Sequence, residues 1–384
     1  MVTDGMLSIR CKVKKTHEIL DHLVKKYRDH VWEVGFSGGK DSTALLHLVI
    51  TFLEKRLKRN MRVPKKVIVV YGDTLLDIPL VREMALGILK DLKEYSEKNF
   101  PGVLDIRILK PLKGEDFFSM IVDRGYPAPH YRFRWCVRTL KIRPTMLFLS
   151  EHMVLSKIVM LTGIRGDESI ERRRIIQKRS RGVLDGIIQR NNELIIQAAP
   201  LLHWSKDEIF AFLASEIQPW NGKPYTKLLQ AYTINETLDD LRCACGLSPN
   251  VRYGCWVCTV IRKDKALERL SKLDEKWHKL IEIKEMIRII SHTKRFRTFD
   301  EQGFPRRLNK KGRLAIVALM AKVLIEYEEA LAGYLEDSNL RAKLTYWLES
   351  LRDDPECKQI CNYVGVDSDM VSRALAKVMS YPTA

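Results

Sequence analysis

The feature that most constrains this chain is a polar, glycine-containing loop placed between a strand pattern and a helix pattern. The apolar run over 31–36 fits a buried strand, and residues 42–59 repeat apolar positions with the period of a long helix. Between them, the loop breaks the strand and opens the helix with Ser37-Gly38-Gly39-Lys40-Asp41-Ser42-Thr43. This order predicts an α/β unit with the loop at the carboxyl end of a buried strand.

The residue types of the loop are those that bind phosphate. Two glycines let backbone N–H groups approach phosphate oxygens, the helix N-terminus adds positive partial charge, and Lys40 adds a full charge. The string is not a Walker A loop, because Val34 stands where that pattern has its first glycine and Asp41 follows the lysine. We therefore expect pyrophosphate binding rather than γ-phosphoryl transfer. The alternative is a solvated turn capped by a serine.

Further strand patterns follow along the chain, over 65–74, 104–109 and 156–164. Two of them end in polar, glycine-marked turns, Gly72-Asp73-Thr74 and Gly163-Ile164-Arg165-Gly166-Asp167-Glu168. Strands that alternate with helices predict a parallel sheet with helices on both faces. Because ligands of such sheets gather beyond the carboxyl ends of the strands, these turns are expected beside the phosphate loop.

The remaining patterns divide the chain into segments. We expect a helical segment over 1–30, the α/β domain over 31–240, a cysteine segment over 241–262 and a basic helical subdomain over 263–384. Two apolar runs between 183 and 202 predict a hairpin or a pair of edge strands. Ser205, followed three residues later by Glu208, predicts a helix that begins with a capping box.

Four of the eight cysteines lie close together, in the pattern C-x-C-x9-C-x2-C formed by Cys243, Cys245, Cys255 and Cys258. Thiolates at this density favour a 4Fe-4S cluster, with tetrahedral zinc as the alternative. Zinc is less well suited, because a structural zinc ribbon normally has two C-x-x-C pairs, and here one pair is contracted to C-x-C. Cys255 and Cys258 are the safest ligands and Cys245 is next, while the fourth is either Cys243 or Cys136.

If Cys136 is not a ligand, its basic neighbours suggest a second role. Arg134, Arg138 and Lys141 would lower the pKa of its thiol, which could then carry a persulfide. The other thiol pair, Cys357 and Cys361, has the spacing of one helix face, and we expect two buried structural thiols there.

The string from Ser37 to Thr43 resembles the PP-loop of the ATP pyrophosphatases, which cleave ATP between the α- and β-phosphates and adenylate a substrate oxygen. This resemblance implies an α/β PP-loop fold, ATP held by the loop, and Mg²⁺ placed with the help of Asp41. Over residues 30–262 the chain also resembles the phosphoadenylylsulfate (PAPS) reductase family, through the two glycine-marked turns and Trp135-Cys136. In that family Asp73, Gly163 and Arg165 would contact the nucleotide.

The cysteine segment is similar to the DndC-like branch of this family, which acts in DNA phosphorothioation. The matching string runs from Cys245-Gly246 to Arg252-Tyr253-Gly254-Cys255-Trp256-Val257-Cys258-Thr259. The likeness implies an iron–sulfur protein that adenylates a DNA phosphate, with Lys40, Asp41 and Cys136 as catalytic residues. A cysteine desulfurase as sulfur donor and other DNA-modification subunits are the implied partners.

The net charge of +18 supports a polyanionic partner. Basic residues concentrate over 165–181 and 294–313, and we expect one or both groups to contact DNA phosphates. Three alternatives remain: a tRNA thiolation enzyme, a sulfonucleotide reductase, and a nucleotide-sensing DNA-binding subunit without catalysis. The tail lacks the Glu-Cys-Gly-(Ile or Leu)-His string of the reductases, which disfavours the second. Without a long apolar run or a leader pattern, we expect a cytoplasmic protein that contacts no membrane.

Overall fold

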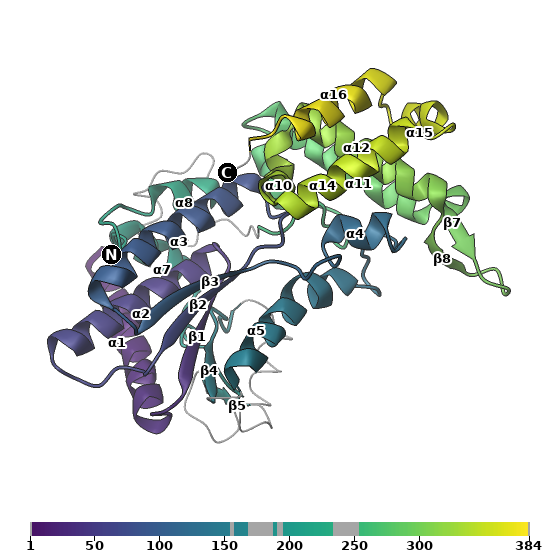
Figure 1. The fold of residues 1–384 in the computed structure, drawn as a ribbon. Coiled ribbons are helices and arrows are strands. Elements are labelled where there is room, and N and C mark those ends of the chain that lie inside the picture. The colour runs from purple at the N-terminus through teal and green to yellow at the C-terminus, as the bar shows by residue number, and fades with distance from the viewer. Residues whose placement is uncertain (1, 154–156, 168–186, 190–194, 233–252, 383–384) are drawn as a thin grey trace. The chain divides into compact units, whose positions relative to one another are not determined.

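The computed structural model describes residues 2–153, 157–167, 187–189, 195–232 and 253–382 (Figure 1). The chain forms two compact units, and each draws on separate stretches of sequence. Unit 1 comprises Met1–Gly72, Leu80–Leu109 and Thr145–Val251. Unit 2 comprises Asp73–Pro79, Lys110–Pro144 and Arg252–Ala384.

The described part of unit 1 contains a six-stranded sheet with the strand order β3-β2-β1-β4-β6-β5. Its strands are β1 (Val31–Phe36), β2 (Val67–Gly72), β3 (Leu104–Leu109), β4 (Ile158–Leu161), β5 (Ile187–Gln189) and β6 (Ile195–Ala198). Neighbouring strands run parallel except β5, which pairs antiparallel with β6 at the edge. The expected parallel sheet is confirmed, and β5 with β6 forms the expected hairpin.

Helices cover both faces of the sheet, as the alternation of side chains along β1 demonstrates. Trp32 stacks on Phe52 of α2 (Lys40–Lys58), with ring centroids 6.2 Å apart. Val31, the preceding residue, packs in a cluster with Phe148 and Leu149 of α5 (Arg143–Met153). Because successive strand residues point to opposite faces, α2 and α5 lie on opposite sides.

Further helices complete unit 1. They are α1 (Val2–Lys26), α3 (Pro79–Asn99), α7 (Lys206–Ser215) and α8 (Thr226–Tyr232), and both α1 and α7 pack against α2. The helix expected after Ser205 is confirmed together with its cap. The Glu208 N–H donates to Ser205 Oγ at 3.1 Å, and the Ser205 N–H donates to Glu208 Oε2 at 2.7 Å.

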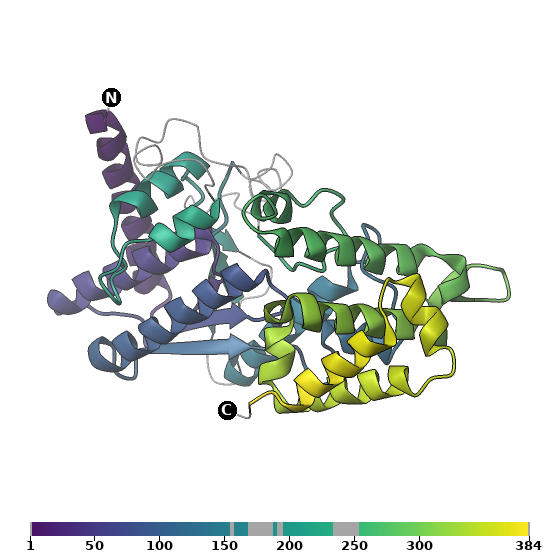
Figure 2. The same ribbon diagram turned by 90° about the horizontal axis from the view of Figure 1, so that it is seen from above.

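Unit 2 is helical, which confirms the predicted C-terminal helices. Its elements are α4 (Phe117–Val122), the π-helix η1 (Val137–Ile142), α10 (Lys265–Leu270), α11 (Glu275–His292), η2 (Lys294–Phe296), α12 (Lys310–Glu326), η3 (Glu328–Leu331), α13 (Ala332–Glu336), α14 (Ser338–Arg352), α15 (Cys357–Tyr363) and α16 (Ser368–Met379). Helix α12 is the centre of the unit, with α4, α11, α14, α15 and α16 packed around it (Figures 1 and 2). Nearly all side chains from Leu314 to Leu324 are buried, as expected for a helix enclosed by others.

A two-stranded hairpin, β7 (Arg297–Phe299) and β8 (Pro305–Leu308), projects from the helices of unit 2 (Figure 1). Its base is fixed by Leu308, whose N–H donates to the Gly125 carbonyl at 2.6 Å. A Cβ at Gly125 would lie 2.9 Å from the Leu308 carbonyl oxygen, so this contact requires glycine. Among the described helices, none is both long enough and apolar enough to cross a membrane.

Candidate functional site

The shape of the phosphate loop is set by Gly38. Its φ is +71°, in the left-handed region that residues with a Cβ rarely adopt. A Cβ at this position would also lie 2.7 Å from the Cβ of Ala85 in α3. The first glycine of the loop is therefore required twice, once by the backbone and once by the packing.

The helix that follows the loop begins without a side-chain cap. Gly39 is the N-cap of α2 and has no side chain to cap the helix, so the first N–H groups of α2 face the loop without an oxygen from the N-cap residue. Gly163 approaches the same turn, where a Cβ would lie 3.0 Å from the backbone of Asp41. A helix N-terminus approached by glycines is a backbone arrangement that can bind phosphate.

Ser42 braces the loop from inside the first helical turn. Its hydroxyl accepts a hydrogen bond from the Ser37 N–H at 3.1 Å and donates to the Gly39 carbonyl at 2.9 Å. The Ser37 hydroxyl oxygen also lies 3.1 Å from Ser42 Oγ. Thr43 is fully buried, and its N–H donates to the Gly39 carbonyl at 2.9 Å. The hydroxyls of the loop thus position its backbone.

Two cations meet at the carboxylate of Asp41. Lys40 Nζ lies 3.1 Å from Oδ2, and Arg165 Nε donates to Oδ1 at 2.7 Å. Arg165 in turn contacts Asp167 through Nη1 at 2.5 Å, and Asp167 accepts from the Lys206 N–H at 2.8 Å. The predicted residues Lys40, Asp41, Gly163 and Arg165 are therefore brought together.

Tyr232 is a member of this site that the sequence did not indicate. Its hydroxyl accepts from the Lys40 N–H at 3.3 Å, and its ring centroid lies 5.2 Å from Lys40 Nζ. The ring of Phe210 lies 5.7 Å from the same ammonium group. Tyr232 follows the loop by almost two hundred residues, so no local pattern connects the two.

The strand beneath the loop carries a buried carboxyl group. Glu33 lies in the middle of β1 and is 3% exposed, and burial raises its pKa to about 8. Its Oε2 has no hydrogen-bond partner among the described residues. The carboxyl group is therefore neutral near pH 7, which keeps a negative charge away from the interior of the sheet.

Asp73, expected at the nucleotide, is buried in unit 2 and organises a turn. Its Oδ1 accepts from the Leu75 N–H at 2.9 Å. Leu75 has a φ of +67°, unusual for leucine, and it packs against Gly333, where a Cβ would lie 2.9 Å away. This strained turn begins the segment that meets the cysteines.

The Cys255–Cys258 pair forms a tight turn held against the segment that follows Asp73. The Cys258 N–H donates to the Cys255 carbonyl at 3.1 Å. On either side of Cys255, the Trp256 N–H donates to Leu76 O at 3.0 Å, and the Ile78 N–H donates to Gly254 O at 3.1 Å. The buried Trp256 indole donates to Ala330 O at 3.0 Å, which ties the turn to the helices of unit 2.

The thiols of Cys136, Cys255 and Cys258 lie near enough to the Lys141 ammonium group to influence its pKa. Cys255 Sγ lies 3.3 Å from Thr74 Oγ1 and 3.6 Å from Asp77 Oδ1. Burial, with the Asp77 carboxylate, raises the pKa of Cys255 to about 12. Burial disfavours the charged form of Lys141 and by itself would lower the pKa of this lysine. The neighbouring acidic groups together have the larger effect and raise the pKa; they are Cys255, Asp77, Cys136 and Cys258.

The expectation of a lowered pKa for Cys136 is wrong. Burial and the neighbouring Cys258 thiol raise the pKa of Cys136, and the opposing effect of Lys141 is smaller. The structure does bring Cys136 to the Cys255–Cys258 turn, although more than a hundred residues separate them.

The donor chemistry at this turn fits a soft metal or an iron–sulfur cluster, because thiols dominate it. Cys243 and Cys245 lie outside the described residues. Within the described part of the chain, no three His, Cys, Asp or Glu side chains are grouped closely enough to hold a metal ion. The described thiols are therefore an incomplete ligand set.

The two basic groups differ in what the structure describes. Of the group over 165–181, only Arg165 lies within the described residues, and it pairs with Asp41 of the loop. The group over 294–313 lies on and around the β7–β8 hairpin. There Phe299 and Phe304 are exposed, whereas Phe296 is buried.

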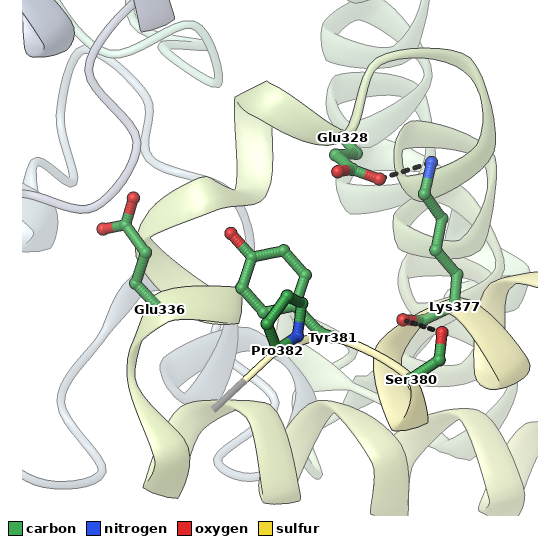
Figure 3. Close-up of a pocket in the computed structure, with 6 residues that line it drawn as sticks. All are labelled: Glu328, Glu336, Lys377, Ser380, Tyr381 and Pro382. Carbon is green, nitrogen blue, oxygen red and sulfur yellow. Dashed lines mark hydrogen bonds and ion pairs between the residues drawn. The ribbon is translucent and has the colours of Figure 1, made fainter. Parts of the chain in front are cut away.

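A separate pocket lies at the end of α16 and contains no residue of the predicted sites (Figure 3). Glu328 and Lys377 form an ion pair on its wall, and Lys377 also donates to the Leu324 carbonyl at 3.0 Å. These contacts secure α16 to the end of α12. The lining consists of Glu328, Glu336, Lys377, Ser380, Tyr381 and Pro382.

Comparisons with known proteins identify the family of the chain. The phosphoadenosine phosphosulfate reductase domain matches residues 31–261. The uncharacterized protein MJ0066 of Methanocaldococcus jannaschii is 28% identical over 253 residues, which cover 65% of this chain and 41% of that protein. The chain thus spans about two fifths of that relative's length.

Two solved structures have a similar arrangement over part of the chain. The phosphoadenylyl-sulfate reductase of Candida auris in complex with phosphate is 18% identical, with a TM-score of 0.37, over 57% of this chain and 85% of that one. The FMN adenylyltransferase of Candida glabrata in complex with FAD and inorganic pyrophosphate is 16% identical, with a TM-score of 0.34, over 56% and 59%. Neither likeness bears on the function of this chain.

Proposed function

Because this chain belongs to the phosphoadenosine phosphosulfate reductase domain family, we propose that it is an ATP pyrophosphatase that adenylates a DNA backbone phosphate for sulfur incorporation. The observation that carries the proposal is the loop between β1 and α2. Its left-handed Gly38 and the start of α2, where the N-cap Gly39 carries no side chain, are suited to two linked phosphates. The absence of a Walker A string favours cleavage between the α- and β-phosphates.

The charged residues of the loop have distinct tasks in this proposal. Lys40 binds the β- and γ-phosphates, and to do so its ammonium group exchanges Asp41 for a phosphate oxygen. Arg165 then holds Asp41, which helps to place Mg²⁺. When bound, Mg²⁺ supplies charge neutralisation on the phosphates. Lys40 and Arg165 stabilise the charge that develops on the leaving pyrophosphate.

The proposed reaction consists of two displacements at phosphorus. A non-bridging oxygen of the DNA phosphate attacks the α-phosphorus, the bond to the β-phosphate oxygen breaks, and pyrophosphate leaves. A sulfur nucleophile then attacks the adenylated DNA phosphorus, and AMP leaves. When the sulfur arrives as a cysteine persulfide from a desulfurase, a second thiol cleaves the S–S bond. The resulting disulfide is reduced by an external thiol.

The cysteine turn is the proposed site of a 4Fe-4S cluster. Cys255 and Cys258 would hold it together with Cys245 and either Cys243 or Cys136, and zinc is the alternative occupant. When bound, such a cluster supplies one-electron transfer or sulfur activation. The nearness of the Cys136 thiol to Cys258, and of Cys258 to Cys255, supports this assignment.

The experiment that tests the activity follows the products of ATP with a DNA acceptor present. We expect pyrophosphate and AMP, and Lys40→Ala is expected to lower the rate about 100-fold, a typical loss when one charge-stabilising group is removed. Lys58→Ala is the matched control, because this lysine lies at the opposite end of α2 and is exposed. ADP as the product, or equal rates for wild type and Lys40→Ala, contradicts the proposal.

The acceptor and the role of Cys136 need separate measurements. Mass spectrometry of nuclease-digested DNA and tRNA from expressing cells identifies the thiolated polymer, and sulfur found only in tRNA would refute the DNA assignment. Cys136→Ala separates the two roles of that thiol. Loss of bound iron makes Cys136 a ligand, whereas retained iron with lost sulfur transfer makes it the sulfur carrier.

A further inference from the structure

The stretch over 125–144 of unit 2 is strongly basic and contains no aspartate or glutamate. It carries Arg132, Arg134, Arg138, Lys141 and Arg143, of which Arg143 is paired with Glu115. Within the described chain, no carboxylate forms an ion pair with Arg132 or Arg138, and both are exposed. An exposed run of one charge sign is complementary to a polyanion.

Aromatic side chains alternate with these arginines at a tight turn. His130 and Phe133 pair across the turn, with the Phe133 N–H donating to the His130 carbonyl at 2.9 Å. The turn presents Tyr131, which is 76% exposed, and the Arg134 guanidinium lies 5.3 Å from its ring centroid. Phe133 is 39% exposed. An aromatic ring beside an arginine is a platform on which a nucleobase can stack.

This turn is fixed to the cysteine site on one side. Thr259, next to Cys258, donates its hydroxyl to the Pro129 carbonyl at 2.6 Å. The Trp135 indole donates to the Pro127 carbonyl at 2.9 Å, and Cys136 follows directly in the chain. A strand bound on Tyr131 would therefore lie beside the proposed sulfur chemistry.

The same turn is fixed to the base of the β7–β8 hairpin on the other side. The Ala128 N–H donates to Ser291 Oγ at 2.9 Å, and the His130 and His292 rings lie 6.1 Å apart. Beyond His292 the hairpin exposes Phe299 and Phe304, at 44% and 60%. Exposed Arg306 and Arg307 lie between these rings and the turn along β8. Asp300 Oδ2 lies 2.6 Å from Arg306 Nη2 and neutralises that one charge. The hairpin remains basic overall.

We propose that these elements form one track for a single-stranded polynucleotide, which runs from the β7–β8 hairpin to the turn at Tyr131 and ends at the cysteine turn. The arginines contact phosphates and the exposed rings stack on unpaired bases. Stacking requires bases that are not already paired, so the track selects single strands over duplexes. Only the identification of this strand with the DNA acceptor rests on the proposed function.

The test measures binding of a fluorescein-labelled single-stranded DNA 20-mer to the full chain by anisotropy, without ATP. Tyr131→Ala is expected to weaken binding about tenfold through the loss of one stacked base. Tyr131→Phe, which keeps the ring, is expected to bind like wild type. The matched control is Tyr346→Ala, because Tyr346 is likewise an exposed tyrosine, at 66%, and lies on α14, which is not part of the track. Since Tyr131 is exposed, its removal leaves the core intact.

A second variant tests the phosphate contacts. Arg132→Ala with Arg138→Ala is expected to reduce the slope of log K against log salt by about 1.4, because each phosphate contact on a single strand contributes about 0.7. Arg373→Ala on α16, which removes one positive charge outside the track, is the control and is expected to leave the slope unchanged. An unchanged slope in the double variant, or wild-type affinity in Tyr131→Ala, overturns the track.

Competition distinguishes the possible sources of the strand. Unlabelled single-stranded DNA or RNA of the same sequence is expected to displace the probe at concentrations at least tenfold below those needed for duplex DNA. RNA as the stronger competitor supports the track and refutes DNA as the acceptor, whereas duplex as the stronger competitor overturns the track. Pyrophosphate release is measured separately, so a chain that binds strands but releases none refutes the proposed activity alone.

Discussion

The phosphate loop of unit 1 and the cysteine turn of unit 2 are assembled in opposite ways. The loop is a run of consecutive residues in which Ser37, Gly39 and Ser42 hydrogen-bond to one another. The cysteine turn draws on three stretches far apart in the chain, 73–79, 110–144 and the region after 252. A local device keeps its shape through backbone geometry, whereas an assembled one depends on the packing of the whole unit.

The largest expected effect tests the assembled site. Cys255→Ser is expected to remove nearly all bound iron and sulfide from anaerobically purified protein, because serine oxygen is a poor ligand for a soft metal. Metal analysis and absorbance measure the loss. Cys357→Ser is the matched control, since this buried thiol lies 3.5 Å from Cys361 on α15 and takes no part in the turn.

Two outcomes would change the assignment of this site. Zinc in place of iron in the wild-type protein would make the turn a zinc site. Iron retained by Cys255→Ser would exclude Cys255 as a ligand, and the turn would then be a structural clip held by Trp256 and its hydrogen bonds.

The next effect concerns the strand that carries the phosphate loop. The unfolded chain releases the Glu33 proton near the ordinary pKa of 4.5, but burial raises the folded pKa to about 8. The folded state binds more protons in this range, so stability falls as pH rises from 4.5 to 8. Glu33→Gln removes this loss. As pH rises from 4.5 to 7, the free energy of unfolding of the variant is expected to increase by about 3 kcal/mol relative to that of wild type.

Denaturant unfolding at several pH values measures this gain. Glu94→Gln, at an exposed position of α3, is the control and is expected to follow the wild-type profile. Parallel profiles for Glu33→Gln and wild type would mean that Glu33 is not held neutral in the folded protein.

The same contrast explains what the sequence could predict. The phosphate loop, the parallel strands and the capping box at Ser205 depend on neighbours within a few residues, and their patterns were sufficient. Tyr232 and the raised pKa of Cys136 depend on segments that approach only after folding. Basic neighbours along the chain suggested a lowered Cys136 pKa, but burial, which no local pattern reveals, has the larger effect.

Gly38→Ala is expected to have a smaller effect than Glu33→Gln, about 2 kcal/mol of lost stability with weaker ATP binding. The left-handed backbone alone costs a residue with a Cβ about 1–2 kcal/mol, and overlap with Ala85 adds to it. Gly102→Ala is the matched control, because Gly102 has a φ of +76° with nothing within 4 Å of an added Cβ. Thermal unfolding and ATP titration measure both variants.

The overlap with Ala85 can be isolated in a double-mutant cycle. In an Ala85→Gly background, Gly38→Ala is expected to lose only the backbone component and to match Gly102→Ala. Equal losses in both backgrounds would mean that the loop relaxes away from α3. Its shape would then depend on backbone geometry alone, which would sharpen the contrast with the cysteine turn.

The smallest effect tests whether the loop is self-supporting. Ser42→Ala removes the oxygen that accepts from the Ser37 N–H and donates to Gly39 O, and it is expected to cost about 1 kcal/mol in stability. ATP affinity should fall several-fold, because the loop backbone is no longer pre-organised. Thr51→Ala is the control, since among the described residues its hydroxyl bonds only within its own helix α2, at His47 and Leu48. If both variants lose the same stability but keep ATP affinity, the phosphate loop is held by its surroundings, as the cysteine turn is.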